Sequence, residues 1–160
     1  MSDPLFTKVG RRYRPVTPSE VCERATQYVI DSANRQQAKL TSPREAKSFL
    51  AHMGGVDHEQ FGVIYMDNRH RVIKVEIVFE GTIDGASVHP REIVKRALQE
   101  NAAAVMFFHN HPSGIAEPSQ ADERITHRLK DALALLEIRT IDHLIIGGTT
   151  VMSMAERGLL

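Results

Sequence analysis

Two histidines, a serine and an aspartate lie close together in this chain with the spacing of a metal site. His109 and His111 are separated by one residue, Asp122 follows eleven residues after His111, and Ser119 lies three residues before that aspartate. Two imidazole nitrogens and one carboxylate oxygen form a ligand set that Zn²⁺ accepts while a fourth position is left for water, as in catalytic zinc sites. The spacing therefore favours a metal-dependent hydrolase.

The elements predicted around these residues can bring them together. Ala102 to Phe108 is short and apolar throughout, which predicts a central strand covered on both faces. Alternate side chains of a strand point to the same side, so His109 and His111 should leave its end on one face. Ser119 is a suitable N-cap for a helix over about 119–136, which places Asp122 in the first turn and near the two imidazoles.

The same residues also have a purely structural explanation. Ser119 and Asp122 can form a reciprocal capping pair, and a histidine at a strand end is more often a hydrogen-bonded polar residue than a ligand. A His-x-His pair alone is therefore a weak indication of a metal. The serine and the aspartate at their offsets make a chance match far less expected, so we prefer the metal site.

The remaining pattern predicts an α/β domain with a mixed sheet flanked by helices. Thr17-Pro18-Ser19-Glu20 and Ser42-Pro43-Arg44-Glu45 both combine an N-cap residue, a proline at the first helical position and a glutamate that closes a capping box. The first helix has Val21, Ala25, Val29 and Ala33 at helical spacing on one face. Strands are predicted over 61–66, 72–79, 143–146 and 150–153, and a further helix over 90–100.

The bulk properties are those of a single globular domain. The chain has 160 residues, and its 20 lysines and arginines balance 20 acidic residues, so no net charge would attract a polyanion. Cys22 is its one cysteine, which excludes an internal disulfide and a thiolate zinc site. We find neither a signal peptide nor an apolar run long enough to cross a bilayer, and we expect a cytoplasmic protein that does not associate with membranes.

The first residues differ from the rest in charge. Residues 1–16 carry Lys8, Arg11, Arg12 and Arg14 but only one acidic residue, Asp3. We interpret 1–16 as a flexible basic arm, either a solvated tail or a contact for nucleic acid or another partner. A helix over 17–40 and a metal-binding domain over 41–160 would follow it.

The site residues, taken together, resemble a known signature. Glu59, His109-x-His111 and Ser119-x-x-Asp122 look like the JAMM signature of the JAB/MPN metallopeptidase superfamily. The string from His109 to Gly114 is similar to the bacterial RadC-like (UPF0758) branch of that superfamily. The resemblance extends over roughly residues 40–160, with further matches at Glu117-Pro118-Ser119, Gly81-Thr82-Ile83, His89-Pro90-Arg91-Glu92 and Asp142-His143.

The resemblance implies a fold and a role for each signature residue. The fold would be a three-layer α-β-α sandwich with a mixed central sheet, layered like the cytidine deaminases. One zinc ion would be held by His109, His111 and Asp122, with Glu59 as general base and Ser119 stabilising the oxyanion.

Some roles stay open at the level of sequence. Glu59 is preferred as the base through the resemblance, because three other acids, Asp57, Glu76 and Glu80, lie in the same region. His127 is either a second partner of the site or, as we prefer, a surface histidine. Asp142-His143 could orient a liganding imidazole, because such histidines usually donate their other N–H group to an oxygen. Cys22 is expected to pack in the first helix.

Three functions are compatible with these features. The leading one is a zinc-dependent peptidase or isopeptidase that acts on a protein or peptide. The second is a nucleic-acid-directed hydrolase or binding module in DNA processing, supported by the basic arm. The third, a non-catalytic scaffold, is disfavoured because all five signature positions are filled.

Two further expectations concern partners. Longer members of the branch carry a helix-hairpin-helix region associated with DNA, and the forty residues before the domain leave no room for it, so the DNA-repair role transfers poorly. The hairpin from Phe61 to Phe79 could offer an edge to an extended peptide or to another copy of the chain, so an oligomer is one expectation.

Overall fold

The computed structural model describes residues 5–36, 38–40, 42–81 and 88–160. In chain order its elements are β1 (Phe6–Val9), β2 (Arg12–Pro15), α1 (Pro18–Gln36), α2 (Pro43–Leu50), the 3-10 helix η1 (Ala51–Gly55), β3 (Gln60–Met66), β4 (Val72–Glu80), α3 (Pro90–Gln99), β5 (Ala104–His111), α4 (Gln120–Ala134), β6 (Arg139–Gly147) and β7 (Thr150–Ser153). Residues 1–4 of the predicted arm, and Thr82 and Ile83 of the RadC-like pattern, lie outside the described residues.

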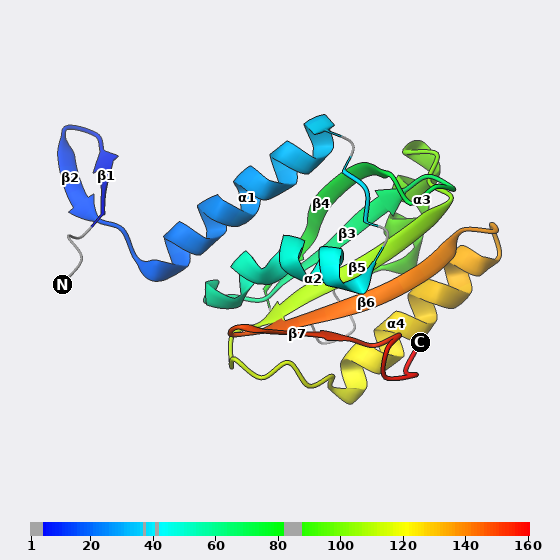
Figure 1. The fold of residues 1–160 in the computed structure, drawn as a ribbon. Helices are drawn as coiled ribbons and strands as arrows, with labels where there is room; N and C mark the ends of the chain where they lie inside the picture. Colours follow the sequence, from blue (N-terminus) through cyan, green and yellow to red (C-terminus); the bar gives the residue numbers. More distant parts are fainter. Residues whose placement is uncertain (1–4, 37, 41, 82–87) are drawn as a thin grey trace.

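A five-stranded mixed sheet forms the centre of the molecule, in the order β4-β3-β5-β6-β7 (Figure 1). β5 and β6 are parallel and are joined through α4, whereas the other neighbours are antiparallel. A parallel pair needs such a crossover, because a tight turn can join only antiparallel strands. The apolar strand that ends in His109 and His111 is therefore central, as its composition predicted.

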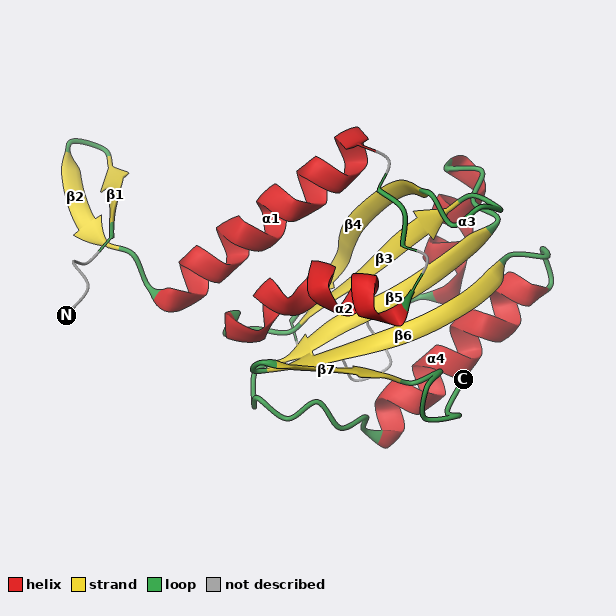
Figure 2. Ribbon diagram, viewed as in Figure 1, coloured by secondary structure: helices red, strands yellow, loops and turns green. Residues whose placement is uncertain are grey.

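Helices cover both faces of this sheet (Figure 2). On one face, even-numbered strand residues such as Ile64, Met106 and Phe108 pack with Ile30 of α1 and Leu50 of α2. On the opposite face, the odd-numbered strand residues Phe61, Val63 and Phe107 pack with Ile93 of α3 and with Ile125 and Leu129 of α4. Since strand side chains alternate between faces, both faces of β5 are buried, and the predicted α-β-α sandwich is confirmed.

The first helix begins as predicted but buries a different face. Thr17 Oγ1 accepts the Glu20 N–H at 3.2 Å and the Glu20 carboxylate accepts the Thr17 N–H at 2.8 Å, so the capping box is present. The buried residues of α1 are Ser19, Thr26, Ile30 and Ala33, whereas Val21 is 39% exposed. The buried face is rotated from the predicted one, with Ala33 common to both, because polar residues take part in the contact: the hydroxyl of Ser19 accepts the Asp57 N–H at 3.0 Å.

A two-stranded hairpin occupies most of the segment that we predicted to be a flexible basic arm. β1 and β2 pair in an antiparallel register from Phe6 opposite Pro15 to Val9 opposite Arg12, and Gly10 adopts a φ of 62° in the turn. Such a backbone conformation favours glycine. Figure 1 shows the hairpin beyond the N-terminal end of α1, apart from the sheet. The division of the chain at residues 16 and 40, and nucleic-acid binding by this segment, stay predictions.

None of the helices in the described part of the chain combines the length and the apolar character that crossing a membrane requires.

Candidate metal centre

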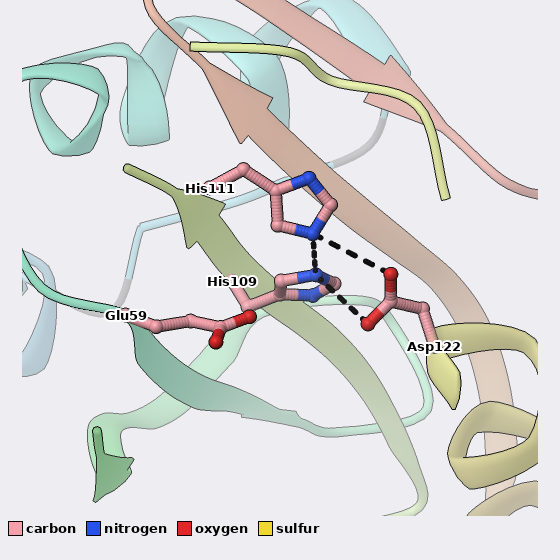
Figure 3. A group of neighbouring side chains, drawn as sticks. All are labelled: Glu59, His109, His111 and Asp122. Carbon is pink, nitrogen blue, oxygen red and sulfur yellow. Dashed lines mark hydrogen bonds and ion pairs between the residues drawn. The ribbon is translucent and has the colours of Figure 1, made fainter. Parts of the chain in front are cut away.

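The structure brings Glu59, His109, His111 and Asp122 together at one end of the sheet (Figure 3). His109 and His111 end β5 on the face covered by α4, and Asp122 lies in the first turn of that helix. The ligand-type atoms of the four residues all lie within 4.8 Å of one another. Asp122 is 2% exposed and His109 is fully buried, so the centre is open to solvent mainly at His111 and Glu59.

Three of these side chains converge through atoms that can coordinate a cation. The two Nε2 atoms of His109 and His111 are 2.9 Å apart. Asp122 Oδ1 lies 3.3 Å from His109 Nε2, and Asp122 Oδ2 lies 3.4 Å from His111 Nε2. The remaining question is whether these nitrogens present protons or lone pairs to one another.

The tautomer of His111 follows from its other nitrogen. Its Nδ1 lies 2.8 Å from the carbonyl oxygen of Ile115, which can only accept, so Nδ1 carries the proton and Nε2 presents a lone pair in the neutral ring. The loop reaches this position because it runs across Gly147, where a Cβ would lie 2.4 Å from Ala116 N and 2.5 Å from Ile115 C. Gly147 therefore permits the contact that orients His111.

A directed chain of hydrogen bonds sets the tautomer of His109. The Thr126 hydroxyl donates to the carbonyl oxygen of Asp122 at 2.5 Å, and its oxygen lies 2.5 Å from His143 Nδ1. Since that hydroxyl has one proton, His143 Nδ1 must be the donor to it. His143 Nε2 then accepts from His109 Nδ1 at 2.8 Å, which leaves a lone pair on His109 Nε2. The chain ends at the backbone carbonyl of Asp122, so the network ties the imidazole of His109 to the helix that carries the carboxylate.

The centre is consequently built from acceptors. Two imidazole lone pairs and a carboxylate face one another, and such a group is stable only with a cation or added protons between them. Burial raises the pKa of the Asp122 carboxyl, but with protons rather than a cation in the centre the hydrogen bonds that His109 and His111 then donate, together with that of Ser119, outweigh burial and hold that pKa well below its usual range. The hydrogen bond that His111 donates to Asp122 once its Nε2 is protonated raises the pKa of His111. Burial, together with the nearby His109, holds the pKa of His143 well below that of a free imidazole, so His143 is neutral.

Ser119 caps the helix that carries Asp122. Its Oγ accepts the Asp122 N–H at 3.1 Å and donates to Asp122 Oδ2 at 2.6 Å, while the Ser119 N–H donates to the same oxygen at 2.7 Å. The predicted capping pair is thus present at the edge of the centre. It also restricts the Asp122 carboxylate to the orientation that faces the histidines.

Glu59 approaches the centre from the side opposite Asp122 (Figure 3). β3 pairs antiparallel with β5, with Phe61 opposite His109, so the same register continued past the start of β3 brings Glu59 level with His111. The competing acids have other positions. Glu76 accepts from Tyr65 and pairs with Arg96, Glu80 accepts from Gln60, and Asp57 lies beside His58 at the surface.

Asn110 fixes the backbone on both sides of Glu59. Its Oδ1 accepts the Gln60 N–H at 2.8 Å, and its Nδ2 donates to the carbonyl of His58 at 2.9 Å. The residue between the two histidines points to the other face of β5, so one strand presents two imidazoles and positions the glutamate as well. Sequence reasoning missed this role. The available signal was the position of Asn110 between the two histidines.

Two other expectations can be compared with the structure. His127 is exposed on α4, as we preferred. His143, rather than Asp142, contacts the imidazole of His109, while Asp142 accepts the His143 N–H at 2.7 Å and the Ser153 hydroxyl at 2.5 Å. The dipeptide does contact the imidazole of His109, but the contacting atom is a nitrogen of His143 and not an oxygen.

The mixed sheet, its helical layers and this cluster define an α/β domain of the JAB class, and comparison with known proteins specifies the family. The model of the RadC-like JAB domain matches residues 40–159, so the chain belongs to this family. A UPF0758 protein of Vibrio cholerae is 55% identical over 139 residues, which are 86% of this chain and 62% of that protein. A UPF0758 protein of Marinobacter nauticus is 55% identical over 133 residues, or 82% of this chain and 59% of that protein.

The chain spans about three fifths of the length of these curated relatives. Their names state no activity. The recognition of the RadC-like branch from the sequence is confirmed, whereas the reaction is a matter for proposal.

Proposed function

We propose that this protein is a zinc-dependent hydrolase of amide bonds, of the peptidase or isopeptidase type. The observation that carries the proposal is the convergence of two imidazole lone pairs and one buried carboxylate on a common point, with Glu59 beside them. The protein that it acts on is not specified by these residues.

The donor set fits Zn²⁺ in chemistry and in size. Zinc takes imidazole nitrogens at about 2.0–2.1 Å and carboxylate oxygens at about 2.0–2.2 Å in tetrahedral sites, which separates neighbouring ligand atoms by roughly 3.3–3.5 Å. The distances of 2.9, 3.3 and 3.4 Å among the three residues are close to that range. Three protein ligands would leave one position for water or substrate, as catalytic sites require.

Glu59 and the ligands would divide the chemistry between them. A bound zinc ion would act as a Lewis acid and lower the pKa of a water ligand to about 7. The Glu59 carboxylate would take the proton of the attacking water and deliver it to the nitrogen of the leaving amine. Asn110 holds the peptide groups on both sides of Glu59, which fixes the base relative to the histidines.

Ser119 would stabilise the oxyanion through the same hydroxyl that caps α4. In the structure its single proton is given to Asp122 Oδ2, and its oxygen is held by the Asp122 N–H. In the proposed reaction the proton turns from Asp122 toward the developing oxyanion, while the accepting bond keeps the oxygen in place. One such donor is worth about 10²–10³ in rate.

The proposal is tested by loading the purified chain with zinc and offering it two libraries, of linear peptides and of peptides branched at a lysine Nε. We expect cleavage with the uptake of one water per bond, lost on removal of zinc by a chelator and recovered when zinc is returned. Folded, zinc-loaded protein that cleaves no amide bond in either library would overturn the proposal. Zinc-dependent cleavage of a phosphodiester instead would favour the nucleic-acid alternative.

His143 is expected to tune zinc affinity without touching the ion. His143→Leu removes the acceptor for His109 Nδ1, so the ring loses its fixed tautomer, and we expect zinc affinity to fall by about 10–100-fold. His143→Gln can still accept from His109 and donate to Thr126, and it should recover most of the affinity. Competition with a chelator measures both variants, and melting of the zinc-free proteins reports the cost to the fold. Equal affinities in the two variants would assign His143 a packing role only.

A further inference from the structure

A groove between α1 and β4 lies on the face of the sheet opposite the metal centre. It has a volume of about 360 Å³, and the partly buried Ile77 contributes apolar surface to it. Glu23 and Asp31 of α1 and Glu80 of β4 line the same groove. We call it the α1–β4 groove.

The acids of the α1–β4 groove are only partly paired, and the one basic group near Glu23 among the described residues is the imidazole of His58, whose Nδ1 lies 3.9 Å away. No lysine or arginine in the described ranges lies within ion-pair distance of Glu23, Asp31 or Glu80, whereas Glu76, the fourth acid of the groove, is paired with Arg96 and Lys74. Gln60 also lines the groove and is 7% exposed. Its Nε2 donates to Glu80 at 3.0 Å, and its Oε1 has no hydrogen-bond partner among the described residues. The groove therefore suits a segment that brings positive charge together with apolar side chains.

The β1–β2 hairpin has the complementary composition. Lys8, Arg11 and Arg12 are exposed around its turn, and none of them has an acidic partner among residues placed by the structure. Val9 and Tyr13, which neighbour them, are 57% and 69% exposed. Because a single two-stranded hairpin is marginally stable in water, exposed apolar residues on it indicate that another surface covers them.

The hairpin cannot reach the groove of its own chain. The Val16 N–H donates to the Leu5 carbonyl at 2.8 Å, and Arg14 binds Glu20 at 2.9 Å, so the hairpin is fixed at the N-terminal end of α1. Glu23 and Asp31 lie farther along the same rigid helix, and the hairpin projects away from the sheet (Figure 1). A groove that accepts this hairpin must belong to a different molecule.

We propose that the hairpin of one copy of this chain occupies the α1–β4 groove of a second copy. The turn residues Lys8, Arg11 and Arg12 would face Glu23, Asp31 and Glu80, and Val9 and Tyr13 would cover Ile77. Each copy has one hairpin and one groove, so two copies can make the contact twice about a two-fold axis. The net charge of zero leaves no overall repulsion against this association. The dimer does not depend on the proposed hydrolysis.

Charge reversal on the full chain tests the dimer. R11E/R12E gives an acidic hairpin beside an acidic groove, and E23K/D31K gives a basic hairpin beside a basic groove. We expect each variant alone to dissociate about 100-fold more readily than the wild type. A mixture of the two restores both contacts, and it should form a mixed dimer within about tenfold of wild-type affinity. R44E/R128E reverses two exposed arginines elsewhere and should dimerise like the wild type.

Sedimentation velocity over a dilution series measures these affinities. The wild-type dimer should dissociate more readily at about 1 M salt than at about 0.1 M salt. Circular dichroism melts identify any variant that fails to fold, in which case the wild-type salt series still decides. A wild-type chain that is monomeric throughout would overturn the proposal, as would dimers that survive both reversals or a mixture without recovery. A monomer that binds single-stranded oligonucleotides through Arg11 and Arg12 would overturn it in favour of nucleic acid.

Discussion

His109→Ala is expected to abolish stoichiometric zinc binding at dilute zinc, whereas the wild-type chain is expected to bind about one equivalent. The variant removes one of three converging ligand atoms and leaves His111 and Asp122, which cannot complete the site alone. It also leaves the accepting nitrogen of His143 without its donor. Because a second defect adds to the loss of a ligand, we expect affinity to fall by more than about 100-fold. Elemental analysis after dialysis against dilute zinc gives the stoichiometry.

The matched control is His127→Ala, which removes an exposed imidazole from α4, the helix of Asp122. It should keep one equivalent of zinc. Zinc that binds only the native state also stabilises it, so the wild type and the control should melt at a higher temperature with zinc than without it. His109→Ala should show no such difference. Full zinc content in a folded His109→Ala variant would contradict our assignment of the metal centre.

Much of the fold could be predicted from the sequence, because local sequence patterns and the burial of side chains indicate the same elements over most of the chain. The apolar run before His109 is short and uniform, as in a strand covered on both faces, and β5 has helical layers on both sides. Both capping boxes, at Thr17 and at Ser42, mark helix starts that the structure contains. Such signals involve residues a few positions apart, so they can be read without tertiary structure.

What the sequence did not reveal depends on contacts between distant segments. The role of His143 follows from its position beside His109 across two parallel strands, which no local pattern specifies. Asn110 reaches backbone about fifty residues earlier, and its amide would look equally suitable for a turn. The hairpin at the N-terminus lacks a buried face, and its strands of four residues each are too short for an apolar alternation that would identify them. The arginines in this segment led us to predict a flexible arm, whereas the backbone pairs as a hairpin with Gly10 in its turn.

The buried face of α1 also depends on contacts with distant segments. The apolar spacing predicted that Val21 would be buried. The buried side instead contains Ser19, which accepts a hydrogen bond from the Asp57 N–H. It also contains Asn34, whose side chain donates to and accepts from the backbone of Val75 in β4. Polar anchors of this kind satisfy the backbone of neighbouring segments and so rotate the helix away from its most apolar face. When a helix has few large apolar residues, such polar contacts are enough to decide which face is buried.

Glu59→Gln is expected to separate metal binding from catalysis. Glutamine has nearly the shape of glutamate but cannot take a proton from water, so hydrolysis should fall by about 10²–10⁴-fold. The three proposed ligands, His109, His111 and Asp122, are untouched, and Asn110 still holds the backbone around position 59. Zinc content and the melting temperature should therefore stay close to those of the wild type. The measurements are initial rates on an amide substrate found in the library screen, beside elemental analysis and a melt.

Asp57→Asn is the matched control for that experiment, because it neutralises the acid two residues earlier, which lies at the surface beside His58. Its rate should remain within about twofold of the wild type, since a base must lie within hydrogen-bond reach of the proton that it takes. If Asp57→Asn lost the activity and Glu59→Gln kept it, the base would be Asp57. A loss of zinc in Glu59→Gln would instead make Glu59 a fourth ligand, because the carboxylate lies within 4.8 Å of the other ligand atoms and is close enough to be drawn into the coordination sphere. Retained zinc with lost turnover is the combination that only a general base at position 59 explains.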